Sequence, residues 1–221
     1  MNILALETAT DACSVALLTA NRLAFRHEIA PRRHTDLVLG MIDSVLRESQ
    51  LTRNDIGAIA FGHGPGSFTG VRVAASIAQG IALGRALPVA AVSTLRALAA
   101  GAVRRGDGQR VLVALDARRH EIYFAAYDFG GGKYASKTVI DDTLMAPEDV
   151  LVPASGAWLT AGNGWRTYQA RFNAAIAALP AALVEFPDAR DIARLAAVDL
   201  AAGRGLKPAQ ARPRYLRGAV D

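Results

Sequence analysis

GHGPGSFTGVR, residues 62–72, joins an apolar run to a helical pattern rich in small residues. The stretch lacks the lysine of a phosphate-binding GxxxxGK[ST] loop, and its glycines do not follow the GxGxxG spacing of a dinucleotide-binding fold. A glycine-rich turn before a helix N-terminus can bind an anion through its free N–H groups. The same glycines also suit a tight turn that packs against a neighbouring strand. The residues leave both interpretations open.

Outward from this loop, apolar runs predict strands and helical spacing predicts helices. The expected strands cover residues 3–7, 13–18, 23–28, 56–61, 89–92, 112–116, 121–129 and 158–161. The expected helices cover residues 34–49, 69–87, 93–103 and 188–202, with a short helical piece at 147–152. Ser67 and Ser93 are the expected N-caps of the second and third helices, and Thr35 or Asp36 that of the first.

The opening motif of the chain returns in its second half. Residues 3–7 read ILALE and residues 112–116 read LVALD, and each is followed by a polar turn and a second apolar run. A strand that ends in an acid, followed by a turn and a return strand, predicts two related lobes. We expect a first lobe over residues 1–104 and a smaller second lobe over residues 105–221, with the last helix free to pack back on the first lobe.

The composition is that of an ordinary globular protein, with 52% hydrophobic and 20% charged residues among 221. The most apolar stretch, residues 71–92, is interrupted by polar residues and a proline, so no membrane span is expected. We recognise no secretory leader, which predicts a cytoplasmic protein. The lone cysteine, Cys13, excludes an internal disulfide and lies in an alternation typical of a buried strand.

The positive charge comes from arginine. The net charge is +5, and only three of the 25 basic residues are lysines. Arginine pairs at residues 32/33, 104/105 and 118/119 could contact the phosphates of a nucleic acid. Arginines scattered over solvated faces would give the same count, and no basic tract contains interleaved aromatic residues. Both interpretations stay open.

Two acids stand where a cleft between the lobes would bring them together. Glu7 and Asp116 each end the first strand of a lobe, where such a pair can hold magnesium on a nucleotide or position a water. Turn-forming acids at strand ends are an equally good interpretation. None of the four histidines has HxxxH or HExxH spacing, and no GxSxG motif is present, so neither a zinc hydrolase nor a serine triad is expected.

The sequences of the first two long helices indicate contact with something beyond their own domain. In residues 34–49 the apolar set is wider than one core-facing stripe, because Leu39 lies off that stripe. Glycine inside the helix over residues 69–87 costs about 1 kcal/mol relative to alanine. Such a cost indicates close approach of another helix or of a ligand.

The motifs ILALETAT, RRHTDLVL, GPGSFTGVR, ALDARRHEIY, TAGNGW and PRYLR occur in this order over nearly the whole chain. In this series the chain resembles the TsaB (YeaZ) family of the actin/Hsp70/sugar-kinase (ASKHA) superfamily. The resemblance implies an α/β fold with two actin-like, ribonuclease-H-like lobes and a reduced C-terminal lobe. It also implies a role in tRNA processing, namely the threonylcarbamoyladenosine modification at position 37 of tRNAs reading ANN codons.

On this resemblance the protein is a non-catalytic accessory subunit. The paralogue TsaD performs the transfer and carries an HxxxH metal site, whereas the matching stretch here, residues 92–97, reads VSTLRA. The implied partners are TsaD in a heterodimer, the ATPase TsaE, and a second copy of the chain when TsaD is absent, with tRNA contacted only indirectly. No cofactor or metal is expected to bind tightly, and ATP or ADP with magnesium at the interface of the complex is left open.

The family pairs through its two N-lobe helices. The implied interface residues are Leu37, Met41, Val45, Gly70, Arg72, Ala74, Ala75 and Ala78. Arg72 either pairs across this interface or lies beside the cleft. Glu7 stands where the superfamily generally has aspartate, which puts nucleotide binding by Glu7 and Asp116 in doubt.

Two other functions remain open from the residues. The first is an actin-like kinase or ATPase that acts on a small molecule through Glu7, Asp116 and the glycine-rich loop. The second is a tRNA-binding module in its own right, which rests on the excess of arginine.

Overall fold

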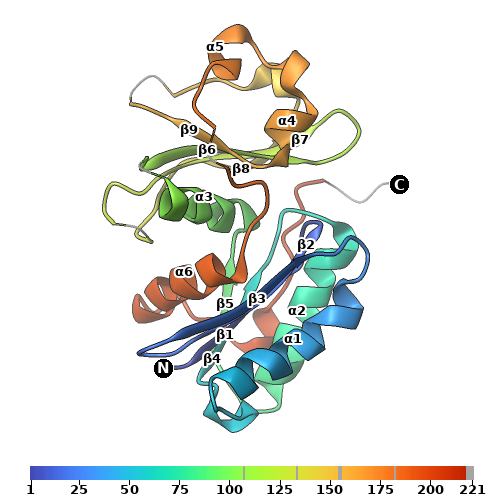
Figure 1. The fold of residues 1–221 in the computed structure, drawn as a ribbon, viewed down its shortest axis with the longest axis vertical. Helices are drawn as coiled ribbons and strands as arrows, with labels where there is room; N and C mark the ends of the chain where they lie inside the picture. Colours follow the sequence, from blue (N-terminus) through green and yellow to red (C-terminus); the bar gives the residue numbers. More distant parts are fainter. Residues whose placement is uncertain (107, 133, 154–155, 182, 218–221) are drawn as a thin grey trace.

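The repeat of the opening motif corresponds to two sheets of the same design, in a computed structural model that describes residues 1–106, 108–132, 134–153, 156–181 and 183–217 (Figure 1). The first sheet has the order β3-β2-β1-β4-β5 and the second β8-β7-β6-β9. In each sheet the strand that ends in the acid pairs antiparallel with the next strand of the chain and parallel with a later one. The predicted relation between the two lobes is therefore confirmed in their topology.

The strands agree closely with the apolar runs. In the first sheet they are β1 Ile3–Glu7, β2 Ala12–Leu18, β3 Leu23–Ile29, β4 Ala58–Gly62 and β5 Val89–Val92. In the second sheet they are β6 Arg110–Asp116, β7 Ile122–Asp128, β8 Lys137–Met145 and β9 Leu159–Ala161. The strand β8 was not expected, because its sequence KTVIDDTLM carries two adjacent acids and has no clear alternation. It lies at an edge of its sheet, where only one neighbour constrains the sequence.

Among the described residues, six α-helices cover the sheets. They are α1 His34–Glu48, α2 Phe68–Leu83, α3 Thr94–Arg105, α4 Asn163–Thr167, α5 Ala174–Ala177 and α6 Ala189–Ala201. Single 3-10 turns lie at Arg53–Asp55, Pro147–Asp149, Gln169–Arg171 and Pro208–Gln210. No helix among the described residues combines the length and apolar character that a membrane crossing requires.

The helix caps agree in part with expectation. The Oγ atoms of Ser67 and Ser93 accept hydrogen bonds from the backbone N–H groups of Gly70 and Arg96, at 3.4 and 3.1 Å. The cap expected at Thr35 or Asp36 is wrong, because α1 already begins at His34 and its N-cap, Arg33, makes no side-chain capping bond.

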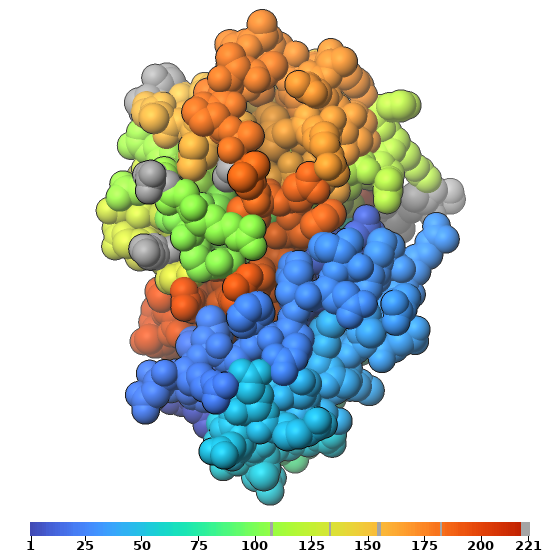
Figure 2. Space-filling model, in the orientation of Figure 1, coloured from blue at the N-terminus to red at the C-terminus, as the bar shows by residue number. Residues whose placement is uncertain are grey.

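The core lies in three layers around the two sheets. The helices α1 and α2 pack on one face of the first sheet, and α4 and α5 lie on the far face of the second (Figure 1). Between the sheets, α3 and α6 form the central apolar layer. The helix α6 comes from the second half of the chain but contacts β1 and β2 of the first sheet. Figure 2 shows the blue-to-cyan first lobe below the green-to-orange second lobe, with α6 at the junction between them.

Candidate functional site

A cavity of about 1050 Å³ opens between the two lobes. The first lobe contributes the turn after β1 and the glycine-rich loop with the start of α2, while the second contributes the turn after β6 and Asn163 of α4. Arg32, the start of α1, Tyr123 of β7 and residues 214–217, near the C-terminus, also line it. Both strands that end in an acid run toward this cavity, so it is the site to compare with the predicted cleft.

The glycines of the loop let α2 approach the end of β1. A Cβ atom at Gly66 would overlap the carbonyl oxygen of Ala9, and one at Gly70 would overlap that of Thr8. The backbone N–H of Ser67 donates to the carbonyl of Ala9 at 2.7 Å, which holds the loop against the strand. Close intramolecular packing thus explains these glycines, and an anion is not needed to account for them.

Glu7 is fully buried and does not line the cavity. Its Oε1 accepts a hydrogen bond from the N–H of Ala9 at 2.7 Å, and its Oε2 accepts one from the hydroxyl of Thr94 at 3.2 Å. Burial raises the pKa of Glu7 to about 7. A magnesium ion on a nucleotide needs an ionised carboxylate that it can reach, whereas this side chain is buried and only about half ionised at neutral pH.

Asp116 does line the cavity, but its oxygens are engaged within the second lobe. Its Oδ1 accepts hydrogen bonds from the N–H of Arg118 at 2.8 Å and from the hydroxyl of Tyr168 at 2.7 Å. Its Oδ2 lies 3.0 Å from the Arg118 guanidinium. These bonds organise a turn in which residues 118, 119 and 120 all have positive φ, a conformation that costs non-glycine residues energy. The geometry is that of a turn-forming acid, and the two predicted carboxylates do not line one cavity.

Arg72 lies beside the cleft. Its Nε donates to the hydroxyl of Tyr215 at 2.8 Å, and its guanidinium carbon lies 3.5 Å from the centre of the Phe68 ring. The Phe68 and Tyr215 rings are themselves 5.7 Å apart between centroids. One arginine and two aromatic rings therefore form a single cluster at the mouth of the cavity.

The C-terminal segment, residues 214–217, makes hydrogen bonds and ion pairs with both lobes. The N–H of Arg214 donates to the carbonyl of His63 in the first lobe at 2.7 Å, while its side chain lies 3.1 Å from Asp141 in the second. Farther along, Arg217 donates to the carbonyl of Ala117 at 3.1 Å. The sequence offered the motif PRYLR but no sign that it crosses the cleft, because these partners are distant in the chain.

Most of the predicted interface side chains face inward, which corrects the expected contact. Met41, Val45, Ala74, Ala75 and Ala78 are all buried in the core between α1, α2 and the first sheet. The sixth inward residue, Gly70, packs on β1 as described above. These four small residues of α2, Gly70, Ala74, Ala75 and Ala78, therefore serve the fold of this chain.

Of the predicted interface residues, only Leu37 and Arg72 keep accessible surface, Leu37 being half-buried and Arg72 exposed. The outer face of α1 and α2 consists of other residues. Leu39 and Leu83 are 58% and 59% exposed, and Gly40 and Gly80 would each find no atom within 4 Å of an added Cβ.

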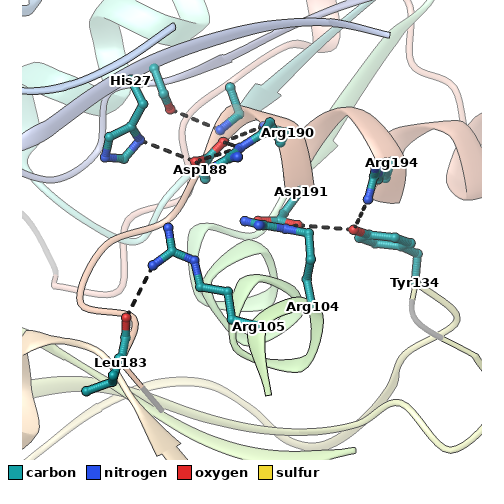
Figure 3. A network of polar contacts seen from close by, with 11 residues as sticks. His27, Arg104, Arg105, Tyr134, Leu183, Asp188, Arg190, Asp191 and Arg194 are labelled. Atoms are coloured by element: carbon teal, nitrogen blue, oxygen red, sulfur yellow. Dashed lines mark hydrogen bonds and ion pairs between the residues drawn. The ribbon is translucent and has the colours of Figure 1, made fainter. Parts of the chain in front are cut away.

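Ion pairs join α6 to α3 and to β3 of the first sheet (Figure 3). Arg104 of α3 makes two hydrogen bonds to the buried carboxylate of Asp191, each of 2.8 Å. Asp188, the N-cap of α6, accepts from Arg190 at 2.7 Å and lies 3.4 Å from Nδ1 of His27. Although burial opposes it, the hydrogen bonds from His27 and Arg190 hold the pKa of Asp188 below its usual range. These contacts fix the lobe junction rather than a reactive centre.

Neither a metal-ligand cluster nor a reactive thiol is found among the described residues. No group of three or more His, Cys, Asp or Glu side chains in that part of the chain is placed to hold a metal ion. Cys13 is buried in β2, and burial raises the pKa of its thiol to about 11. A thiol of that pKa is a poor nucleophile at neutral pH.

Comparison with known proteins gives matches over the whole chain. The family description "tRNA N6-adenosine threonylcarbamoyltransferase" (TsaD) matches residues 23–205. The Escherichia coli protein named tRNA threonylcarbamoyladenosine biosynthesis protein TsaB is 40% identical over 100% of this chain and 96% of its own length. The Haemophilus influenzae protein of the same name is 37% identical over 100% of this chain and 95% of its own. A solved structure described as YeaZ from Pseudomonas aeruginosa has a TM-score of 0.89 at 40% identity, covering 97% of this chain and 99% of that one.

Proposed function

This chain belongs to the TsaB (YeaZ) family, and we propose that it is a non-catalytic accessory subunit of the complex that makes N6-threonylcarbamoyladenosine at position 37 of tRNAs reading ANN codons. In this proposal a TsaD subunit performs the transfer and TsaE joins the complex. This chain pairs with TsaD or, when TsaD is absent, with a second copy of itself. Because its substrate is tRNA, we place the complex in the cytoplasm.

The observation that carries the proposal is the outer face of α1 and α2. Gly40 and Gly80 lie inside helices, are exposed, and have open space where a side chain would stand. Each glycine lowers the stability of its helix by about 1 kcal/mol relative to alanine, and no contact among the described residues of this chain requires glycine at either position. Leu39 and Leu83 expose apolar surface on the same helices. Glycines that let backbones approach, beside exposed leucines, are suited to a helix of a partner protein.

The chemistry of the cleft supports an accessory role over a transferase role. Of the two predicted carboxylates, Glu7 is buried and Asp116 is bound by Arg118 and Tyr168. We therefore propose that this subunit alone holds no cofactor tightly. ATP or ADP with magnesium, if the complex uses it, would need ligands from the partner subunit.

The same observations weigh against the alternative function, a kinase or ATPase of the actin-like superfamily. That function requires an accessible acid to hold magnesium or to activate the acceptor. In the described cleft, neither predicted acid is free to do so.

Assembly with TsaD tests the proposal. Gly80→Arg places a long charged side chain on the outer face, where an added Cβ has no neighbouring atom within 4 Å, so the variant is expected to fold as the wild type does. We expect it to lose co-elution with purified TsaD in size-exclusion chromatography at micromolar concentration. The matched control is Ala201→Arg, which adds the same charge at the exposed end of α6 and should leave co-elution unchanged. Normal binding by Gly80→Arg, with a folded circular dichroism spectrum, would refute the interface.

A further inference from the structure

The mouth of the cleft presents two aromatic rings and an arginine to solvent. Phe68 is 59% exposed and Tyr215 46% exposed, although both are large apolar rings. The Arg72 guanidinium packs on the Phe68 ring and uses its Nε for the Tyr215 hydroxyl. Its two terminal nitrogens make no hydrogen bond or ion pair with any described residue. The cluster is thus ordered by its own contacts while its donors remain available.

The charge of the cavity is unbalanced. Five arginines line it against two acids, Asp11 and Asp116. Three of these arginines have carboxylate partners, namely Arg118 with Asp116, Arg214 with Asp141 and Arg217 with Glu121. The other two, Arg32 and Arg72, have no carboxylate partner among the described residues. Arg32 also has a φ of 65°, a conformation that costs a non-glycine residue energy.

Unpaired guanidinium groups beside exposed aromatic faces suit one class of ligand. A guanidinium binds phosphate oxygens through two parallel N–H bonds, and an aromatic ring stacks on a base of any identity. A mononucleotide with magnesium would also need carboxylates, and of the two that line the cavity Asp116 is engaged by Arg118 and Tyr168, which leaves Asp11 alone. The aromatic faces stand at the rim, where a longer chain can pass, which favours a strand over a free nucleotide.

We propose that this rim binds a single-stranded segment of RNA, with its phosphates on Arg32 and Arg72 and a base stacked on Phe68 or Tyr215. The proposal deepens the proposed function, since it gives this subunit a direct contact with tRNA in place of an indirect one. It does not depend on TsaD, because every group that it uses belongs to this chain.

The test is fluorescence anisotropy with the full-length protein and a labelled oligoadenylate of about ten nucleotides, a length within the range of single-strand binding sites. We expect binding at low salt that weakens as salt rises. The salt slope should fall by about 0.7 in Arg32→Gln and again in Arg72→Gln, as loss of one phosphate contact to a single strand predicts. Phe68→Ala should weaken binding about tenfold, whereas Phe68→Trp, which keeps a stacking face, should retain it.

Arg47→Gln is the matched control. It removes the same charge from the last turn of α1, about 20 Å along the helix from His34 at the cavity. Its affinity for the oligonucleotide should stay within twofold of the wild type. All variants are checked for an unchanged circular dichroism spectrum before binding is measured.

Four results would overturn the proposal. They are no binding at low salt, equal affinity in the Arg72→Gln and wild-type proteins, equal binding of an RNA duplex, and displacement of the RNA by ATP with magnesium. Failure here is distinguishable from failure of the proposed function. A protein that stimulates tRNA modification without binding the oligonucleotide refutes only the RNA site, and one that binds it without affecting modification refutes only the accessory role.

Discussion

Glu7 occupies the end of β1, where an acid would reach a nucleotide in an actin-like cleft, yet its side chain has no exposed surface. Its carboxyl group instead joins β1 to Thr94 at the start of α3. The methylene that distinguishes glutamate from aspartate gives this side chain its extra reach. Burial disfavours the charged form and raises the pKa of Glu7 from 4.5 to about 7.

This pKa makes stability depend on pH. Because the folded-state pKa is raised, the favourable contribution of the protonated form is complete below the unfolded pKa near 4.5 and is lost as pH rises through about 7. Glu7→Gln keeps a neutral side chain at every pH. Between pH 5 and pH 8 we therefore expect the variant to gain about 2 kcal/mol of unfolding free energy relative to the wild type, as measured by urea denaturation.

Glu185→Gln serves as the control for that measurement. It removes a carboxylate that is 41% exposed and, among the described residues, pairs with Arg166 at the surface. Its stability relative to the wild type should change by less than about 1 kcal/mol over the same range. A Glu7→Gln curve that runs parallel to the wild type from pH 5 to pH 8 would show that Glu7 is ionised in the fold.

The sequence could locate Glu7 and Asp116 but not their surroundings. Hydrophobic runs place both acids at strand ends, and the structure has them there. What covers each acid comes from distant positions, since Thr94 contacts Glu7 and Tyr168 contacts Asp116. No local pattern predicts such contacts, and no signal could separate a ligand-binding acid from a turn-forming one.

At the scale of an element, α2 uses glycine in two different ways. Gly70 faces β1, where a Cβ atom would overlap the carbonyl of Thr8, whereas Gly80 faces open space. The sequence showed only that glycine recurs in this helix. Because both kinds of glycine look alike in a single sequence, residues of α2 that pack inside this chain, Gly70, Ala74, Ala75 and Ala78, were named as interface residues.

Alanine at these two glycines should have opposite effects on the isolated protein. We expect Gly70→Ala to lower the free energy of unfolding by about 1–3 kcal/mol, since the added methyl forces α2 away from β1. Gly80→Ala should raise it by about 0.5–1 kcal/mol, because alanine is the better helix former and nothing obstructs it. Thermal or urea unfolding of both variants measures the difference.

The two variants act as controls for each other, as they make the same substitution in one helix. Equal changes of the same sign would contradict the assignment of the two faces. A loss of stability in Gly80→Ala would mean that Gly80 serves the fold of this chain, and the outer face would then lose its main support as an interface.

Other elements show where sequence patterns suffice. The strands β1, β2, β4 and β5 of the first sheet were predictable because each is a largely apolar run, and Ser67 and Ser93 were recognisable caps. The edge strand β8 was missed for the opposite reason, since it carries Asp141 and Asp142 at its centre. Asp142 is buried beside Tyr127 and Ser93, a use of an acid that only the folded chain reveals.

At the scale of the whole molecule, two similar sheets flank a cavity that is lined by the turns after their acid-ended strands. The repeat of ILALE and LVALD predicted the two lobes, and the shared strand order bears this out. The boundary near residue 104 stays a prediction, because α6 crosses to the first sheet and the C-terminal segment contacts both lobes. Neither crossing has a signature in the local sequence.

The lobes offer a partner two distinct surfaces. One is the outer face of α1 and α2, where Gly40 and Gly80 are exposed. The other is the mouth of the cleft, where Arg72 contacts the rings of Phe68 and Tyr215. A subunit built in this way can support a reaction without performing it, by pairing with the transferase on one surface and holding its substrate on the other.

The most direct test is threonylcarbamoyl incorporation into unmodified tRNA by purified TsaD, TsaE and the donor-forming enzyme TsaC, with this protein added, omitted or supplied alone. We expect modification when it is added to the three enzymes, little when it is omitted, and none from it alone. Gly80→Arg should behave as an omission, and Ala201→Arg as the wild type. Equal modification with and without this protein would contradict the accessory role, and modification by this protein alone would contradict its non-catalytic character.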